Sequence, residues 1–277
     1  MKVAVLGLGL IGGSIGLAAR AGGARVVGFD PDLRTREQAL AAGAVDEAVQ
    51  QPEQALAGAD VVFAAAPVGA LAQTVSLALR QTPSDCVISD VGSTKRALLA
   101  ELREQPGVER FIGGHPLAGS HLGGIEHARA HLFQGSSWCL MPSAQTQLAD
   151  RLRALIEEFG ATPVEIDAQT HDRLMARISH LPHVLANVLV AGVADCGERE
   201  RTLAGTGPSF RDATRVAGAS SAIWTDIYLS NADMLIEAID EAVGELTQVR
   251  ARLSERDAAA LSDWSDLARA RRQSLLP

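Results

Sequence analysis

The chain has little cysteine, no basic excess and no long apolar run. Its three cysteines form no CxxC pair and no even set, which predicts reduced thiols in a cytoplasmic protein rather than a disulfide framework. The formal net charge of -8 argues against a nucleic-acid partner, because such binding needs a basic face. Because no apolar run approaches the roughly 20 residues that span a bilayer, no membrane partner is expected.

The sequence also lacks a familiar metal-binding spacing. His127, His131 and Cys139 lie close together but have no fourth ligand at a usual distance, so zinc is the weaker alternative and we expect no metal. Apolar residues make up 47% of the 277 positions, which is enough for a large core. The length favours two domains over one.

Histidine is absent from the first 114 residues, and all seven histidines fall between His115 and His183. The N-terminal run itself allows two interpretations. Met1-Lys2 followed by apolar residues to about Ala19 resembles a signal peptide, but also a buried strand that enters a glycine turn. Five glycines between positions 7 and 16 favour the strand.

The glycine turn reads Gly-Leu-Gly-Leu-Ile-Gly at 7–12, between a β-branched strand and a helical stretch. In this pattern Gly7 permits the tight turn, Gly9 lets the backbone approach a pyrophosphate, and Gly12 lets helix and strand pack closely. Asp30, at the end of the next strand, would accept hydrogen bonds from a ribose and repel a 2′-phosphate. The prediction is a dinucleotide site that prefers NAD to NADP, formed by Gly7, Leu8, Gly9, Leu10, Ile11, Gly12 and Asp30. Arg34 and Arg36 lie close enough to soften that preference, or are simply surface charges.

Further strands alternate with helical stretches, which predicts an α/β Rossmann-type domain with a parallel, doubly wound sheet. Strand candidates lie at 59–66, 85–90, 111–112, 137–141 and 162–166. Ligands bind beyond the carboxyl ends of such strands. The strand-end residues Pro67, Val68, Ser93 and His115 are therefore expected to converge on a nicotinamide, with Pro67 and Val68 as cofactor contacts. Histidine is well suited to acid–base work there, although any single histidine can be an ordinary polar residue.

After about residue 167 the pattern becomes helical. The expected domains are 1–167, binding the dinucleotide, and 168–277, an all-helical C-terminal domain. Helices are predicted over 170–194 and 222–253, and residues 255–273 form an exposed helix or a loose tail. An apolar stripe along 222–253 is large for so small a domain, so part of it is expected to pack on a second subunit; the alternative is a purely internal core.

Two motifs in the helical half carry polar groups. His180 and His183 lie three residues apart, with Pro182 between them, which predicts a kink or a helix start. Asp212 and Arg215 follow a Gly-Thr-Gly-Pro turn at 205–208, where a helix can begin. Arg215 is able to clamp a carboxylate with Asp212 as its support, or the two form an ordinary surface pair.

Taken together, the ordered motifs resemble the prephenate/arogenate dehydrogenase family of tyrosine biosynthesis. They are 7–14, Asp-Val-Gly-Ser-Thr-Lys at 90–95, Gly-His-Pro-Leu-Ala-Gly-Ser at 114–120, Ser-His-Leu-Pro-His at 179–183 and Asp-Ala-Thr-Arg at 212–215. The resemblance covers residues 1 to about 231. It implies a Rossmann-type domain followed by a helical domain that forms a homodimer.

The reaction that this resemblance implies is NAD-dependent oxidative decarboxylation of prephenate to 4-hydroxyphenylpyruvate, or of arogenate to tyrosine. His115 would take or polarise the ring hydroxyl proton, and Ser93 would hydrogen-bond near that hydroxyl. Arg215 would hold a substrate carboxylate, and His183 would lie by the substrate side chain with His180 and Asp212. Some family members carry an acid where this chain has His121, so His121 is a candidate substrate contact whose preference stays open.

Two other classes share parts of this pattern. β-Hydroxyacid and ketopantoate-type reductases use a lysine early in the helical domain, and this chain has no lysine after Lys95, which argues against them. A non-catalytic NAD-binding sensor would keep residues 7–30 but would not need Ser93, His115 or Arg215.

Overall fold

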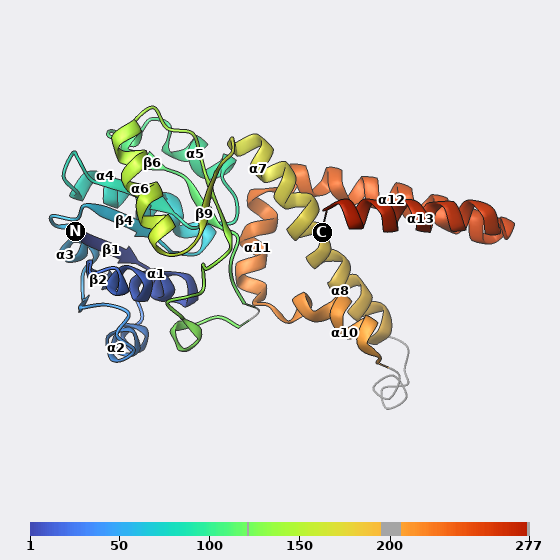
Figure 1. Ribbon diagram of the computed structural model, residues 1–277, viewed down its shortest axis with the longest axis horizontal. Helices are drawn as coiled ribbons and strands as arrows, with labels where there is room; N and C mark the ends of the chain where they lie inside the picture. Colours follow the sequence, from blue (N-terminus) through green and yellow to red (C-terminus); the bar gives the residue numbers. More distant parts are fainter. Residues whose placement is uncertain (121, 195–205, 276–277) are drawn as a thin grey trace. The chain divides into compact units, whose positions relative to one another are not determined.

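The computed structural model describes residues 1–120, 122–194 and 206–275, and its N-terminal part contains a parallel six-stranded sheet (Figure 1). The strand order is β3-β2-β1-β4-β5-β6, so the chain crosses over between β3 and β4. This confirms the expected parallel, doubly wound domain. The strands are β1 (Lys2–Leu6), β2 (Arg25–Phe29), β3 (Glu47–Val49), β4 (Val61–Ala64), β5 (Val87–Asp90) and β6 (Phe111–Ile112).

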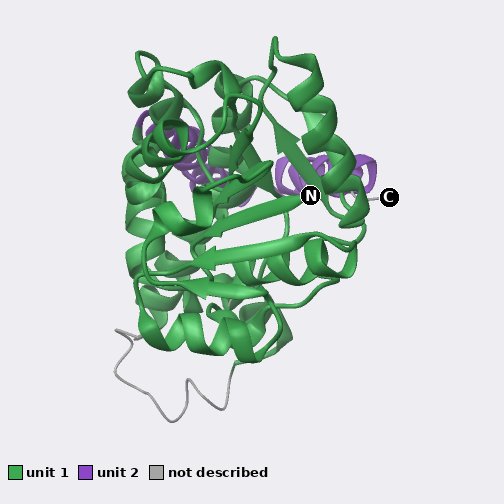
Figure 2. Cartoon of the chain, turned by 90° about the vertical axis from the view of Figure 1, so that its left-hand side faces the viewer, with its two compact units in different colours: residues 1–232 green, residues 233–277 purple. Residues whose placement is uncertain are grey.

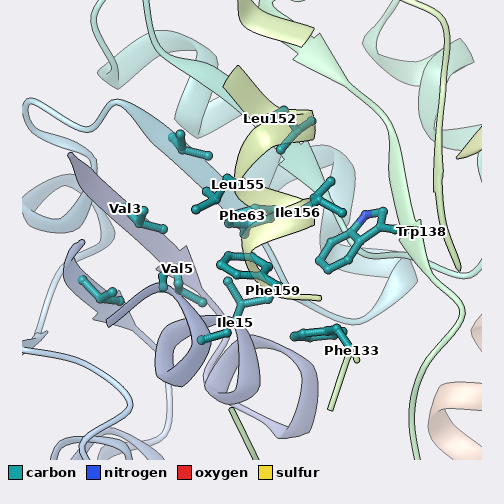
Figure 3. Close-up of a cluster of buried hydrophobic side chains, with 14 of the residues drawn as sticks. Val3, Val5, Ile15, Phe63, Phe133, Trp138, Leu152, Leu155, Ile156 and Phe159 are labelled. Carbon is teal, nitrogen blue, oxygen red and sulfur yellow. The ribbon is translucent and has the colours of Figure 1, made fainter. Parts of the chain in front are cut away.

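Helices cover both faces of this sheet because its strands are apolar on both sides. Val3 and Val5 of β1 belong to one hydrophobic cluster, and Ala4 and Leu6 belong to the other. Figure 3 shows the first cluster, where Phe63 lies among aromatic and aliphatic side chains from other elements. The helices of this region are α1 (Leu10–Ala21), α2 (Leu33–Ala41), α3 (Pro52–Leu56), α4 (Leu71–Gln81), α5 (Arg96–Leu102) and α6 (Thr146–Glu158).

The last strands of the α/β region form a second sheet of their own, with the order β7-β8-β9. Strand β7 (Gly114–Pro116) is antiparallel to β8 (Ser137–Leu140), which is parallel to β9 (Thr162–Glu165). Two of the expected strands therefore do not extend the large sheet. His115 pairs with Cys139 of β8, so β7 continues in the second sheet instead of extending the first.

The predicted helix over 170–194 consists of three parts. Helix α7 (Ala168–Met175) leads into a π-helical turn, η4 (Ala176–His180), and then into α8 (Leu181–Ala194). Proline near the start of a helix lacks the N–H that an interior position would need. Pro182 is the second residue of α8, so the irregularity that the sequence predicted here is the π-helical turn just before it, within one helical stretch.

The predicted helix over 222–253 is interrupted at Asn231, so the expectation of one continuous helix was wrong. Helix α11 (Ser221–Ser230) ends there, and α12 (Ala232–Glu255) follows. The Asn231 side chain is fully buried and donates a hydrogen bond to the carbonyl oxygen of Asp172 at 2.8 Å. Asn231 is the C-cap of α11, and its φ of -128° and ψ of 30° lie outside the helical range. Before α11 lie α10 (Pro208–Thr214) and the 3-10 turn η5 (Arg215–Gly218).

By their internal contacts the described residues form two compact units, 1–232 and 233–277 (Figure 2). Helices α7 to α11 thus group with the sheets, and the predicted division at 167/168 stays a prediction. The second unit contains most of α12 and the helix α13 (Ala258–Leu275), so the segment expected as a helix or a tail is an exposed helix. Leu246 and Leu253 of the apolar stripe are exposed, so the stripe is not wholly an internal core.

One helical stretch, Ala168–Val193, is long and apolar enough to cross a membrane by length and composition. It includes the π-helical turn, and His171, Asp172 and His180 are buried within it. Charged and hydrogen-bonding groups inside such a span are costly in lipid. This pattern fits the core helix of a folded domain better than a membrane helix.

Candidate active site

The glycine loop lies where β1 ends and α1 begins, and its three glycines have different surroundings. Gly7 has φ of +100°, and a side chain there would meet the carbonyl oxygen of Ala65 at 2.4 Å. A side chain on Gly12 would lie 1.8 Å from the carbonyl oxygen of Gly7. Around Gly9, in contrast, nothing lies within 4 Å of such an atom among the described residues. The loop is thus tightly packed at Gly7 and Gly12 and open at Gly9. This arrangement fits a backbone that a pyrophosphate approaches at Gly9.

The first turn of α1 offers a positive helix end to that open space. Its N-cap is Gly9, which supplies no side-chain cap, and the first turn contains no acidic residue. The unpaired N–H groups and the helix dipole are therefore available to an anion. The site fits the phosphates of a dinucleotide.

Asp30 lies just beyond β2, and its carboxylate also shapes the loop. One oxygen accepts a hydrogen bond from the backbone N–H of Leu8 at 2.8 Å, and the other accepts from Asp32 at 3.0 Å. Arg36 donates to the carbonyl oxygens of Asp30 and Pro31 rather than reaching outward. The other nearby cation, Arg34, is exposed.

The remaining cofactor candidates differ in exposure. Leu8 and Leu10 are buried, so only their backbones face the loop, while Ile11 is half-buried. Pro67 is exposed and caps the 3-10 turn η1 (Val68–Ala70), which follows β4. Both Pro67 and Val68 follow the carboxyl end of a central strand, as predicted.

A buried ion pair holds together the segments that carry Ser93 and His115. Asp90 at the end of β5 contacts the Lys95 ammonium, and both side chains are fully buried. The same carboxylate accepts hydrogen bonds from the backbone N–H groups of Gly92 at 2.8 Å and Gly114 at 3.0 Å. One carboxylate thus fixes the turn after β5 against the strand β7.

His115 lies on β7 with its ring edge against a second histidine. Its Nδ1 is 2.9 Å from Nε2 of His171, whose Nδ1 is 2.7 Å from Oδ1 of Asp172. Burial, together with the nearby His171, Lys95 and His180, holds the pKa of His115 well below 6.5. The imidazole is therefore neutral at neutral pH and able to accept a proton.

The other two residues expected beside His115 are less well defined. Ser93 is half-buried in the turn after β5, and its hydroxyl makes no hydrogen bond with any residue that the structure describes. His121 lies outside the described residues.

His180 and His183 lie on either side of the junction between η4 and α8, and both are buried. The amide of Asn231 lies 3.3 Å from Nδ1 of His180, whereas Nε2 of His180 is buried without a partner in the described part of the chain. Burial lowers the pKa of His180 to about 4, against the attraction of Asp172. A neutral His180 whose Nδ1 accepts this bond presents an Nε2–H to a ligand.

A small cavity of about 180 Å³ opens beside His183. The ring of His183 stacks on Trp224 with 3.6 Å between the ring centroids and an interplanar angle of 5°. Its Nδ1 contacts the hydroxyl of Tyr228 and lies 3.1 Å from the amide of Asn187. Burial lowers the pKa of His183, partly offset by a hydrogen bond to the backbone of Val216. Aromatic walls with a few polar groups are typical of a small-molecule pocket.

Asp212 lies on α10, and Arg215 begins η5, whose Ala217 lines this cavity together with the next residue after the turn, Ala219. Helix α10 begins after Gly207, as its sequence indicated. Both charged side chains are exposed, and within the described ranges no ion pair joins them. The structure therefore does not bring them together as a pair.

Sequence reasoning missed five residues of this network: Asp90, Lys95, His171, Asp172 and Asn231. Asp90 and Lys95 were noted as the two ends of the motif at 90–95, and Lys95 as the last lysine of the chain, but neither was given a role. The adjacent pair His171-Asp172 was a usable signal, since an acid next to a histidine in an apolar helix is uncommon. Its contact with His115 joins residues 56 positions apart, which no local pattern reveals.

The fold and site define a two-part, nucleotide-dependent dehydrogenase with a neutral histidine at the strand ends. Two family profiles match the chain: "Prephenate dehydrogenase, nucleotide-binding domain" over residues 15–165, and "Prephenate dehydrogenase, dimerization domain" over 167–266. The chain belongs to the prephenate dehydrogenase family, as the motifs predicted. The first match begins just after the glycine loop.

Known relatives are similar along almost the whole chain. Prephenate dehydrogenase of Bacillus subtilis (strain 168) is 34% identical over 288 residues, which cover 99% of this chain and 76% of that protein. The structure of prephenate dehydrogenase from A. aeolicus in complex with hydroxyphenyl propionate and NAD+ has a TM-score of 0.91 at 25% identity, covering 99% of this chain and 98% of that one. Synechocystis arogenate dehydrogenase has a TM-score of 0.82 at 27% identity, with both chains covered fully.

Proposed function

We propose that this protein catalyses the NAD-dependent oxidative decarboxylation of prephenate to 4-hydroxyphenylpyruvate. The observation that carries the proposal is His115. It is a neutral, half-buried imidazole at the carboxyl end of the sheet, held through Nδ1 so that Nε2 remains for the substrate. The chain belongs to the prephenate dehydrogenase family, and the reaction of that family needs a proton acceptor such as a neutral His115.

NAD, held by the glycine loop and Asp30, would supply the acceptor for the hydride that leaves the ring carbon bearing the hydroxyl. Nε2 of His115 hydrogen-bonds to that hydroxyl and draws its proton as the carbon–oxygen bond gains double-bond character. The ring carboxylate leaves as carbon dioxide, its bonding electrons complete the aromatic ring, and the resulting phenolate oxygen takes the proton back from His115 to become a phenol. Because aromatisation drives the step, the protein mainly orients the substrate.

The residues around the cavity would hold the substrate. Arg215 is exposed beside the cavity and has no ion-pair partner in the described part of the chain, so it is available for a substrate carboxylate. His180 offers a buried Nε2–H, and His183 lies against Trp224 where the substrate side chain would lie. Ser93 would bond near the ring hydroxyl, and Asp212 would border the pocket.

Arogenate is the alternative substrate, because it carries an amino acid where prephenate carries a keto acid on the same ring. The likeness to an arogenate dehydrogenase keeps this alternative open. Absorbance of NADH, followed with NAD and each substrate separately, decides between them. NADH formation with prephenate supports the proposal, whereas turnover of arogenate alone would replace it.

The preference for NAD is the first property that the site predicts. Replacing Asp30 with alanine removes a charged acceptor of ribose hydroxyls, a bond worth about 1.5–3 kcal/mol, so kcat/KM with NAD should fall by about tenfold or more. Asp30→Asn is the matched variant: it keeps an acceptor for Leu8 but no charge, and should mainly relax the rejection of NADP. An unchanged NAD/NADP ratio in both variants would contradict this role.

The second property is the pH dependence. Burial lowers the pKa of His115 well below 6.5. Its imidazole therefore stays neutral at pH 6.5 and becomes protonated only when the pH falls through this lowered pKa. A protonated His115 has no lone pair for the substrate. The acid limb of kcat/KM against pH is therefore expected below pH 6.5. An acid limb above pH 7 would show that the group is not held neutral.

We further propose that the protein is a cytoplasmic homodimer through its helical half. The dimerization-domain profile covers α8, which exposes Leu185, Val188, Leu189 and Val190. Exposed apolar side chains that lie together on a helix usually mark an interface.

A charge on this face should dissociate the dimer. Val188 is 60% exposed in the single chain and would be covered in the proposed interface. In the variant Val188→Glu the new carboxylate would be buried there without an opposite charge, which is costly. Sedimentation should then show a monomer at micromolar concentration, and a dimer for the natural protein. Val164→Glu, on an exposed residue of β9 outside the dimerization profile, is the control and should remain dimeric. A monomeric natural protein would refute the dimer.

A further inference from the structure

Behind His115 lies a row of three side chains joined by hydrogen bonds. The contacts run from Nδ1 of His115 to Nε2 of His171 at 2.9 Å, and from Nδ1 of His171 to Oδ1 of Asp172 at 2.7 Å. The two rings meet edge to face, with 5.1 Å between centroids. His171 and Asp172 have no exposed surface, so neither reaches solvent.

Asp172 accepts in every one of its side-chain contacts. Its oxygens receive the backbone N–H of Lys95 at 2.8 Å and of Arg96 at 2.9 Å, and the Arg96 guanidinium lies 3.4 Å away. Burial by itself raises the pKa of Asp172, but the hydrogen bonds from His171, Arg96 and Lys95 outweigh it and lower the pKa. The group is a carboxylate, which has no proton to donate.

The Asp172 carboxylate, at one end of the row, determines which nitrogen atoms of the two histidines carry hydrogen. Because the carboxylate only accepts, Nδ1 of His171 must carry the hydrogen. In a neutral ring Nε2 of His171 then has a lone pair, so Nδ1 of His115 must donate to it. A neutral His115 with its hydrogen on Nδ1 has its lone pair on Nε2.

We infer that His171 and Asp172 are positioning residues, which hold His115 in the tautomer whose Nε2 accepts the substrate's hydroxyl proton. The inference rests on the proposed function, in which His115 is that acceptor. It extends the function to two residues that touch neither substrate nor cofactor. A histidine oriented by a hydrogen-bonded carboxylate is a known way to fix a tautomer and stabilise the imidazolium that forms.

The charges around His115 show why such a device is useful. Burial disfavours a positive charge on His115, and the nearby Lys95 ammonium does the same. This keeps His115 neutral before the reaction but makes the transient imidazolium costly. The carboxylate of Asp172, linked through the polarisable ring of His171, offsets that cost as the proton moves.

Asp172 has a structural role as well, because it accepts the N–H groups at the start of α5. Substitution of Asp172 would disturb that cap together with the histidine. The hydrogen bonds at the start of α5 are made by Asp172 and not by His171, so His171 is the better residue for a test.

The experiment compares His171→Phe with His171→Gln. Phenylalanine keeps a ring but removes both nitrogens, so His115 loses its partner. Glutamine offers a carbonyl oxygen to Nδ1–H of His115 and an amide hydrogen to Asp172, which preserves the order of donors. The surface variant His131→Gln serves as the control, since His131 is exposed and outside the site.

Two measurements are made on each protein. The first is the single-turnover rate of NADH formation at saturating NAD and substrate, with KM measured separately. The rate should fall about 10²-fold in His171→Phe with KM nearly unchanged, and should recover most of that loss in His171→Gln. The second is nitrogen-15 NMR of labelled histidine, which should show His115 protonated at Nδ1 in the natural protein and in His171→Gln, but not in His171→Phe.

A rate loss of less than about tenfold in His171→Phe, or His115 protonated at Nε2 in the natural protein, would overturn the inference. If His171→Phe does not fold, the spectrum of the natural protein and the rate of His171→Gln decide it. A natural protein that turns over neither prephenate nor arogenate refutes the proposed function instead, and the NMR result still reports on the row of hydrogen bonds.

Discussion

Replacing His115 with asparagine should lower kcat by about 10²–10⁴-fold, the range usual for loss of a general acid–base group. Asparagine keeps a polar side chain that is able to contact His171 but offers no basic nitrogen to the substrate hydroxyl. NAD binding, which depends on the loop at 7–12 and on Asp30, should be unchanged. The measurements are steady-state kinetics near pH 8 and the dissociation constant of NAD.

The control for this variant is His131→Asn, on an exposed histidine of the same segment, which should retain normal kinetics. A near-normal kcat for His115→Asn would mean that another group, or the solvent, takes the proton. Loss of NAD binding together with activity would instead indicate damage to the fold.

Replacing Lys95 with methionine should lower the free energy of unfolding by about 3–5 kcal/mol. The ammonium and the Asp90 carboxylate are both fully buried, so the substitution leaves a buried charge without its counterion. Asp90 also holds Gly92 and Gly114, so the turn after β5 and the strand carrying His115 should loosen, and activity should fall with stability. Denaturant unfolding monitored by tryptophan fluorescence provides the free energy.

Lys2→Met is the matched control, because Lys2 lies at the start of β1 and is only half-buried. Its substitution should cost less than about 1 kcal/mol. Adding Asp90→Asn to Lys95→Met should recover part of the loss by removing the orphaned charge. A loss below about 1 kcal/mol in Lys95→Met would show that the pair is solvated rather than buried.

The parts of the fold that follow from local chemistry were predictable from the sequence. Three features each depend on residues that are neighbours in the chain. They are the glycine loop, the alternation of strands and helices, and the irregular helix next to Pro182. The placement of His115 at the strand ends followed from topology, because parallel strands present their carboxyl ends on one edge.

The remaining features depend on contacts between distant residues. The pairing of His115 with Cys139 diverts β7 into a second sheet, and the bond from Asn231 to Asp172 breaks a helix that periodicity alone would continue. The row behind His115 and the Asp90–Lys95 pair join separate elements. In each case tertiary packing decides among local conformations that the sequence leaves open.

The most direct test of the central claim is the stoichiometry of the reaction with purified protein, NAD and prephenate. NADH by absorbance, released carbon dioxide and the aromatic product by chromatography should appear in equal amounts, with 4-hydroxyphenylpyruvate as that product. NADH without carbon dioxide would indicate an ordinary alcohol oxidation, and no NADH with either prephenate or arogenate would contradict the proposed function.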